Sequence, residues 1–307
     1  MRRGYCAGGV MHIYQRTVSG FNLFYTMEDF IVFYTIVATQ TRKLKICLLG
    51  MCLMVDHIHL LVSPESLKQL SRFMSACSSL YVREFNAKTG RSGSLFEPRY
   101  GSAVKTDGKR TRAAIAYLFN NPVEKMLCQR AEEYRWNFLS YYKTSQQKKS
   151  DWRRFMSRPL RRSVQIVDAT FCKGHYLKHA LLEKLYHGLS DTEMQVLTDH
   201  IITRYFSFDV IKTCGYFRSY EDMVLAINSN TGSEYDINET HYCKTDAPYR
   251  EIIKYLKKSG IEEPRSLIVR NEDTKRHYLS LLRSHTSASV SQIRKFLHMA
   301  PLQRTKT

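Results

Sequence analysis

Residues 54–63 read Met-Val-Asp-His-Ile-His-Leu-Leu-Val-Ser and place His57 and His59 at the head of a short apolar run. Such a run is typical of a β-strand, and successive side chains on a strand point to opposite faces of the sheet. The two histidines therefore share one face, and the apolar residues between and after them take the other. Two neutral imidazoles on one face can bind one divalent ion together. They can equally be polar residues on the solvated face of an edge strand, so a second motif is needed.

That second motif lies at residues 113–123, which read Ala-Ala-Ile-Ala-Tyr-Leu-Phe-Asn-Asn-Pro-Val. The alanine-rich start favours a helix, Asp107 is a suitable N-cap, and Pro122 predicts that the helix ends at Asn121. At about 100° per residue, Tyr117 and Asn121 are neighbours on the face opposite to the apolar side chains of this helix. If that face lies over the histidines, a nucleophilic phenol and an amide oxygen meet a metal-binding pair. These are the parts of a metal-assisted phosphoryl-transfer site.

Three segments, in this order and spacing, resemble the REP-associated tyrosine transposases, which belong to the HUH superfamily of single-strand DNA transposases with one catalytic tyrosine. The segments are residues 55–62, residues 93–100 (Gly-Ser-Leu-Phe-Glu-Pro-Arg-Tyr) and residues 117–123. The resemblance extends over residues 11–142, including the Tyr-Arg-Trp sequence at 134–136.

The chain departs from the family pattern in two places. The family usually has Pro-Asn or Pro-Glu before the first histidine, where this chain has Val-Asp at 55–56. It usually has Leu-Asn-Pro-Val after the tyrosine, where this chain has Asn-Asn-Pro-Val at 120–123. Neither departure removes a functional atom.

The resemblance implies a catalytic set of Tyr117, His57 and His59. The tyrosine is the nucleophile, and the two histidines with the side-chain oxygen of Asn121 bind Mg²⁺ or Mn²⁺. The substrate it implies is single-stranded DNA with palindromic hairpins. Attack leaves a 5′-phosphotyrosine that conserves the bond energy, so the strands can be rejoined. Relatives include monomers and homodimers, and the sequence leaves the subunit number open.

Net charge agrees with a polyanionic partner. The chain carries +19, and residues 1–160 account for +14 of it. A basic surface attracts polyanions through counterion release, so nucleic acid is the first candidate partner and an anionic membrane the second. No apolar run approaches the ~20 residues needed to span a bilayer, which argues against the membrane. The candidates for DNA contact are Arg16, Arg91, Arg99, Lys105, Lys109 and Arg110.

The eight cysteines form no C-x-x-C pair. This usage is typical of reduced thiols in a cytosolic protein, and we expect a cytoplasmic, nucleoid-associated location. Cys214, His241 and Cys243 are a weak candidate zinc group, because the paired ligand spacing of zinc sites is absent.

The predicted elements follow the order strand, helix, two strands, helix, strand, helix. This is the order of a ferredoxin-like α+β domain, with the histidine strand inside an antiparallel sheet. The other strands are expected at residues 12–19, 43–54 and 100–105, and the first two helices at 27–41 and 64–86.

We divide the chain into a catalytic domain (residues 1–142), a basic linker (143–162) and a mainly helical C-terminal domain (163–307). Residues 273–285 and 289–298 are typical of two short helices. They are a candidate DNA-binding helix-turn-helix whose second helix carries Gln292, Arg294 and Lys295.

Two other functions use some of the same parts. One is a replication-initiator-like HUH nickase, which differs in substrate and setting. The other is a catalytically silent DNA-binding protein derived from a transposase. The intact His57, His59 and Tyr117 argue against the silent protein.

Overall fold

The computed structural model describes residues 9–144, 156–229 and 245–300. Its centre is a four-stranded antiparallel sheet with the strand order β2-β3-β1-β4. The strands are β1 (Val10–Arg16), β2 (Cys47–Leu53), β3 (His57–Ser63) and β4 (Gly101–Lys105). Strand β3, which carries both histidines, lies between β1 and β2, so the predicted ferredoxin-like α+β fold with an interior histidine strand is confirmed.

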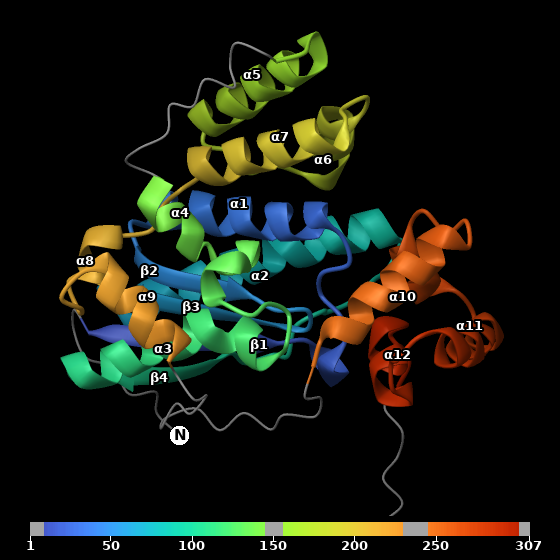
Figure 1. Cartoon of the computed structure of the whole chain (residues 1–307), viewed down its shortest axis with the longest axis horizontal. Coiled ribbons are helices and arrows are strands. Elements are labelled where there is room, and N and C mark those ends of the chain that lie inside the picture. Colours follow the sequence, from blue (N-terminus) through green and yellow to red (C-terminus); the bar gives the residue numbers. More distant parts are fainter. Residues whose placement is uncertain (1–8, 145–155, 230–244, 301–307) are drawn as a thin grey trace, which may run out of the picture.

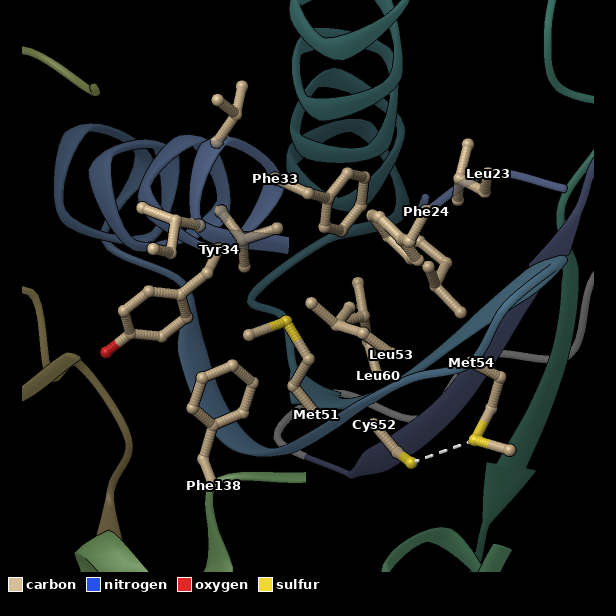
Figure 2. Packing of buried hydrophobic residues seen from close by; sticks show 14 of the residues in the cluster. Leu23, Phe24, Phe33, Tyr34, Met51, Cys52, Leu53, Met54, Leu60 and Phe138 are labelled. Carbon is tan, nitrogen blue, oxygen red and sulfur yellow. Dashed lines mark hydrogen bonds between the residues drawn. The ribbon is translucent and has the colours of Figure 1, made fainter. Parts of the chain in front are cut away.

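Helices α1 (Met27–Leu44) and α2 (Leu67–Thr89) cover one face of the sheet, and α3 (Gly108–Glu124) covers the other (Figure 1). Figure 2 shows Leu53 and Leu60 pointing from the sheet toward Phe33 of α1. On the opposite face α3 approaches β2 closely. A Cβ atom at Gly50 would lie only 3.2 Å from Phe119, so glycine at this position allows the close approach.

Several predicted boundaries were wrong. The first strand, expected at residues 12–19, spans Val10–Arg16, and the helix expected at 64–86 spans Leu67–Thr89. Helix α3 continues through Pro122 to Glu124, because a proline in the last turn removes one hydrogen bond and two more residues still complete the turn. Residues 43 and 44, predicted to start the second strand, are the last two residues of α1. Lys45 then adopts the left-handed conformation that ends the helix, with φ 52°.

The helices after residue 138 pack around the sheet domain in three groups. Helices α5 (Arg158–Cys172), α6 (His179–Tyr186) and α7 (Asp191–Arg204) form a layer outside α1. The short α4 (Leu139–Thr144), α8 (Val210–Cys214) and α9 (Tyr220–Asn228) lie beside β2 and α3. The third group is α10 (Ala247–Lys258), the 3₁₀ segment η5 (Pro264–Val269), α11 (Glu272–His285) and α12 (Val290–Phe296), and η5 contacts α2. All three groups share one continuous hydrophobic core with the sheet domain.

The expected linker and helix-turn-helix can be located only in part. Residues 145–155 of the linker lie outside the described residues, and residues 158–162 form the first turns of α5. Helices α11 and α12 are present at the expected positions. However, Gln292 donates to the carbonyl of Thr245, and Arg294 donates to the carbonyl of Ala300. These side chains are therefore directed at the protein itself, and a DNA-binding role for α12 stays a prediction.

A buried ion cluster joins the third group to the start of α1. Asp29 is fully buried and accepts hydrogen bonds from Arg265 of η5 and from the backbone of Tyr25, and His179 lies 2.9 Å from it. Burial alone would raise the pKa of Asp29, but the charge of Arg265 and the contact with His179 outweigh it and lower the pKa to about 2.

We expect Asp29→Asn to destabilise the fold by about 3–5 kcal/mol at pH 7, because the buried Arg265 loses one of its two carboxylate partners and keeps only the pair with Glu263. A carboxyl whose pKa is lowered by folding stabilises the folded state at any pH above its pKa in the unfolded chain, about 3.9. This stability is lost as the pH falls through the pKa of the folded state. Urea unfolding at pH 7 and melting between pH 5 and 2 measure both effects. The wild type should lose stability over that range, and Asp29→Asn should lose less. Asp273→Asn, in an exposed pair on α11, is the matched control and should change stability by less than about 0.5 kcal/mol. Equal effects of the two substitutions would contradict the prediction.

Candidate functional site

Three histidines meet on the face of the sheet that α3 covers. His57 and His59 are 8% and 0% exposed, and their ring centroids lie 4.9 Å apart. The third is His12 of β1, whose Nε2 lies 3.0 Å from Nδ1 of His59. The strand alternation explains this arrangement, because His12 pairs with Leu61 and therefore shares the face of His57 and His59.

Helix α3 places Tyr117 and Asn121 over these histidines. The ring of Tyr117 lies 5.8 Å from the rings of both His12 and His59. Nδ2 of Asn121 lies 3.4 Å from Nε2 of His59. Tyr117 is only 3% exposed, so its ring is buried beside the histidines. The structure therefore brings together the four residues that the sequence singled out.

Asp56 forms a hydrogen bond with His57 and an ion pair with Lys295. One carboxylate oxygen accepts a hydrogen bond from Nδ1 of His57 at 2.6 Å, and the other lies 3.2 Å from Nζ of Lys295 on α12. Burial would raise the pKa of Asp56, but the bond with His57 and the charge of Lys295 hold it well below its usual range. Because the carboxylate fixes the proton of neutral His57 on Nδ1, the ring lone pair lies on Nε2.

The donor set fits a divalent cation. Among the described residues, no group of three His, Cys, Asp or Glu side chains is placed to hold a metal. Besides the three histidines, Asn121 brings an amide to this centre. Its Oδ1 is buried and has no hydrogen-bond partner in the part of the chain that the structure describes. A buried oxygen without a partner is unusual, and a bound cation would satisfy it.

The six basic residues expected to contact DNA divide into two groups. Arg99, Lys109 and Arg110 are exposed, and Arg16 is half-buried at the end of β1. Lys105 and Arg91 are engaged within the protein, and their contact with DNA stays a prediction. Lys105 is only 3% exposed, because β4 directs it to the face under α3. Arg91 donates to Asn86 and to the carbonyls of residues 93 and 94, so it holds its own loop together.

Three functional candidates were missed at the sequence level. His12 had a signal, since polar side chains at 12, 14 and 16 alternate with apolar ones along the first strand. Asp56 stands directly before His57, where an acidic neighbour suggests an orienting partner. Lys295 was named only as part of the candidate helix-turn-helix, and its role at this site had no signal, because it lies 239 residues from Asp56 along the chain.

Two tyrosines that follow the helix of Tyr117 are engaged in packing. Tyr141 donates to Asp199 and Tyr142 donates to the carbonyl of Leu49, as packing residues do. His241 and Cys243 of the weak zinc group lie outside the described residues. Within residues 9–144, 156–229 and 245–300, no helix combines the length and apolarity needed to cross a membrane.

The site is thus a cluster of histidines on a ferredoxin-like sheet, covered by a helix that carries a tyrosine. Residues 11–121 match the family model of IS200-like transposases. This range runs from β1 to Asn121 and includes Asp56, all three histidines and Tyr117. The chain therefore carries an IS200-like transposase domain at residues 11–121.

A solved structure of a REP-associated tyrosine transposase bound to a REP hairpin is similar, with a TM-score of 0.39 and 15% sequence identity. The match covers 44% of this chain and 79% of that chain. No curated protein matches the chain.

Proposed function

We propose that this protein is a metal-dependent single-stranded DNA endonuclease and strand transferase that acts at DNA hairpins. Membership of the domain in the IS200-like family implies single-stranded DNA transposase activity. The observation that carries the finer proposal is the position of Tyr117, whose ring lies against His12 and His59 and four residues before Asn121.

The chemistry is a transesterification by Tyr117. The phenol loses its proton and its oxygen forms a bond to the scissile phosphorus, the bond from phosphorus to the 3′ oxygen breaks, and the 3′ oxygen takes up a proton. The products are a 5′-phosphotyrosine and a free 3′-hydroxyl. Attack by a 3′-hydroxyl reverses the step and rejoins a strand, because the covalent link conserves the energy of the phosphodiester.

His57, His59 and Oδ1 of Asn121 are the residues that would hold Mg²⁺ or Mn²⁺. Such a cation supplies Lewis-acid polarisation of a non-bridging phosphate oxygen. The role of Asp56 is to fix the proton and the orientation of His57, and His12 does the same for His59 through its contact with Nδ1. Because Tyr117 and His59 are 3% and 0% exposed, the scissile strand must displace part of the covering layer to reach them.

The test is a covalent-adduct assay. Labelled single strands with and without a hairpin are incubated with the protein and Mn²⁺, and the products are separated under denaturing conditions. We expect a protein–DNA adduct on the hairpin strands, with the DNA mapped to Tyr117 by peptide mass spectrometry, and loss of the adduct with a chelator. A silent DNA-binding protein forms no adduct under any of these conditions. A replication-initiator-like nickase forms the adduct without a preference for the hairpin.

Lys295 contacts Asp56 and so helps to position His57, which leads to a prediction for its substitution. We expect Lys295→Met to reduce cleavage by about 10- to 100-fold, the range for outer-shell residues of metal sites, because Asp56 loses one of its two partners. DNA affinity should change little, since Nζ of Lys295 faces Asp56. Cleavage rates and filter binding measure the two effects, and Lys295→Arg should restore most of the rate. The control is Arg276→Met, whose side chain is 71% exposed on α11. Wild-type cleavage by Lys295→Met would contradict the assigned role.

A further inference from the structure

A cavity of about 550 Å³ lies where α10 meets the start of α1 and the segment between residues 127 and 136. Most of its lining is aromatic or aliphatic, and the side chains relevant here are Phe24, Phe30, Cys128, Tyr134, Trp136 and Arg250. The volume falls within the ~300–1,000 Å³ of small-ligand sites, which combine an apolar lining with a few polar groups.

Three stacked rings line part of this cavity. Trp136 stacks on Phe30 with ring centroids 4.5 Å apart and planes 7° apart, and Phe30 stacks on Phe24 at 4.4 Å. Phe30 and Trp136 are half-buried. Tyr134 is fixed by a hydrogen bond from its hydroxyl to the carbonyl of Leu53. Because these rings are held by contacts within the protein, they form a preformed surface on which another aromatic ring can pack.

Four charged side chains line the cavity, and three of them are already engaged within the protein. One carboxylate oxygen of Glu133 accepts two backbone N–H groups of its own turn. Arg135 forms an ion pair with Asp199 at 3.3 Å. Asp246 is only 4% exposed and its Oδ2 is buried, so this oxygen does not face the cavity.

The fourth charged side chain, Arg250, is available to a ligand. It is exposed on α10 and forms no ion pair within residues 9–144, 156–229 and 245–300. Its charge reaches the apolar wall. Burial raises the pKa of the Cys128 thiol to about 11 and Glu133 adds to this shift, whereas Arg250 opposes it. A guanidinium in this position favours an anionic partner, and a carboxylate can accept two parallel hydrogen bonds from it.

We propose that this cavity binds a small aromatic acid, whose ring packs against Phe30 and Trp136 and whose carboxylate binds Arg250. One available cation beside an apolar wall matches a ligand with one anionic group on an apolar body. A cationic ligand would be repelled by Arg250, and a neutral one would leave the guanidinium without a partner. Trp136 and Arg250 lie outside residues 11–121, so the site depends on the segments that surround the matched transposase domain.

The test uses 1-anilinonaphthalene-8-sulfonate, a fluorescent aromatic acid, as the probe. The chain has two tryptophans, Trp136 in the cavity and Trp152, so a Trp152→Phe protein has Trp136 as its single tryptophan. Energy transfer from Trp136 to the probe therefore reports probe that is bound at or near this cavity. We expect saturable energy transfer with one probe per chain.

Two competitors with the same ring isolate the contribution of the charge. Phenylacetate carries a carboxylate, and phenylacetamide carries a neutral amide of similar size. At constant ionic strength, we expect phenylacetate to displace the probe at a concentration at least about tenfold lower than phenylacetamide, because charge-assisted hydrogen bonds are about twice as strong as neutral ones. Acetate, which lacks the ring, should displace the probe less well than either.

Variants locate the anionic contact. Arg250→Gln should remove the difference between phenylacetate and phenylacetamide. Lys258→Gln removes the same charge from an exposed position at the end of α10, outside the cavity wall, and should keep the difference. Far-UV circular dichroism shows whether each variant folds, and the competition in the Trp152→Phe protein tests the proposal without any variant at Arg250.

Three outcomes would overturn the proposal. The first is no energy transfer from Trp136, and the second is equal displacement by phenylacetate and phenylacetamide. The third is displacement by acetate as strong as that by phenylacetate, because the ring would then contribute nothing. A difference that persists in Arg250→Gln would overturn the assignment of Arg250. The titration contains no DNA and no metal, so its result is independent of the adduct assay and of the proposed function.

Discussion

Tyr117→Phe is expected to abolish the covalent protein–DNA adduct and to lower strand cleavage by about 10⁴- to 10⁶-fold, the loss seen when a nucleophile is removed from an enzyme. The substitution removes one oxygen atom and keeps the ring that lies against His12 and His59. The fold and the DNA affinity should therefore persist. Denaturing gels with labelled hairpin strands and Mn²⁺ measure the adduct, and filter binding measures the affinity.

Tyr14 offers a matched control for this substitution. It lies on β1 directly opposite His59, on the same face of the sheet, but does not belong to the tyrosine helix. Tyr14→Phe should keep the adduct and change the cleavage rate by less than about tenfold. An adduct of equal yield in Tyr117→Phe and wild type would show that Tyr117 is not the nucleophile. Loss of the adduct only in Tyr14→Phe would identify Tyr14 of β1 as the nucleophile instead.

The sheet domain was predictable because its signals are local. The alternation around His57 and His59 predicts a strand with both imidazoles on one face, and the structure shows this arrangement. The spacing of Tyr117 and Asn121 predicts one helix face, and that face covers the histidines. In both motifs, residues two or four positions apart determine which side chains share a face. The position of α3 over the histidines depends in addition on contacts between segments about 60 residues apart.

The errors have physical causes that the local pattern does not contain. Pro122 was expected to end α3, but a proline costs little in a last turn whose carbonyls are already leaving the helix. Lys105 was expected on the surface, but the register of β4 on β1 turns it under α3. Lys295 reaches the site from the C-terminal region, and its contact with Asp56 depends on packing between segments far apart in the chain.

His57→Ala should separate catalysis from binding. We expect cleavage to fall by at least about 10²- to 10³-fold, the range for removing one group that stabilises developing charge, since the divalent cation loses one of two imidazoles. Affinity for hairpin DNA should stay within about threefold of wild type, because affinity depends mainly on contacts between basic side chains and phosphates. Cleavage kinetics, filter binding and Mn²⁺ titration calorimetry measure the three quantities.

The neighbour of His57 decides how this result is interpreted. Removing the imidazole leaves the Asp56 carboxylate with Lys295 as its remaining charged partner, and Asp56 is largely buried. Asp56→Asn in combination with His57→Ala relieves that buried charge. The double variant should therefore recover stability without recovering cleavage or Mn²⁺ binding. If the double variant regained cleavage, the loss in His57→Ala would come from a disturbed fold, and the imidazole would hold no cation. If His57→Ala kept full Mn²⁺ affinity, the cation would bind elsewhere and His12, which contacts His59, would be the next residue to test.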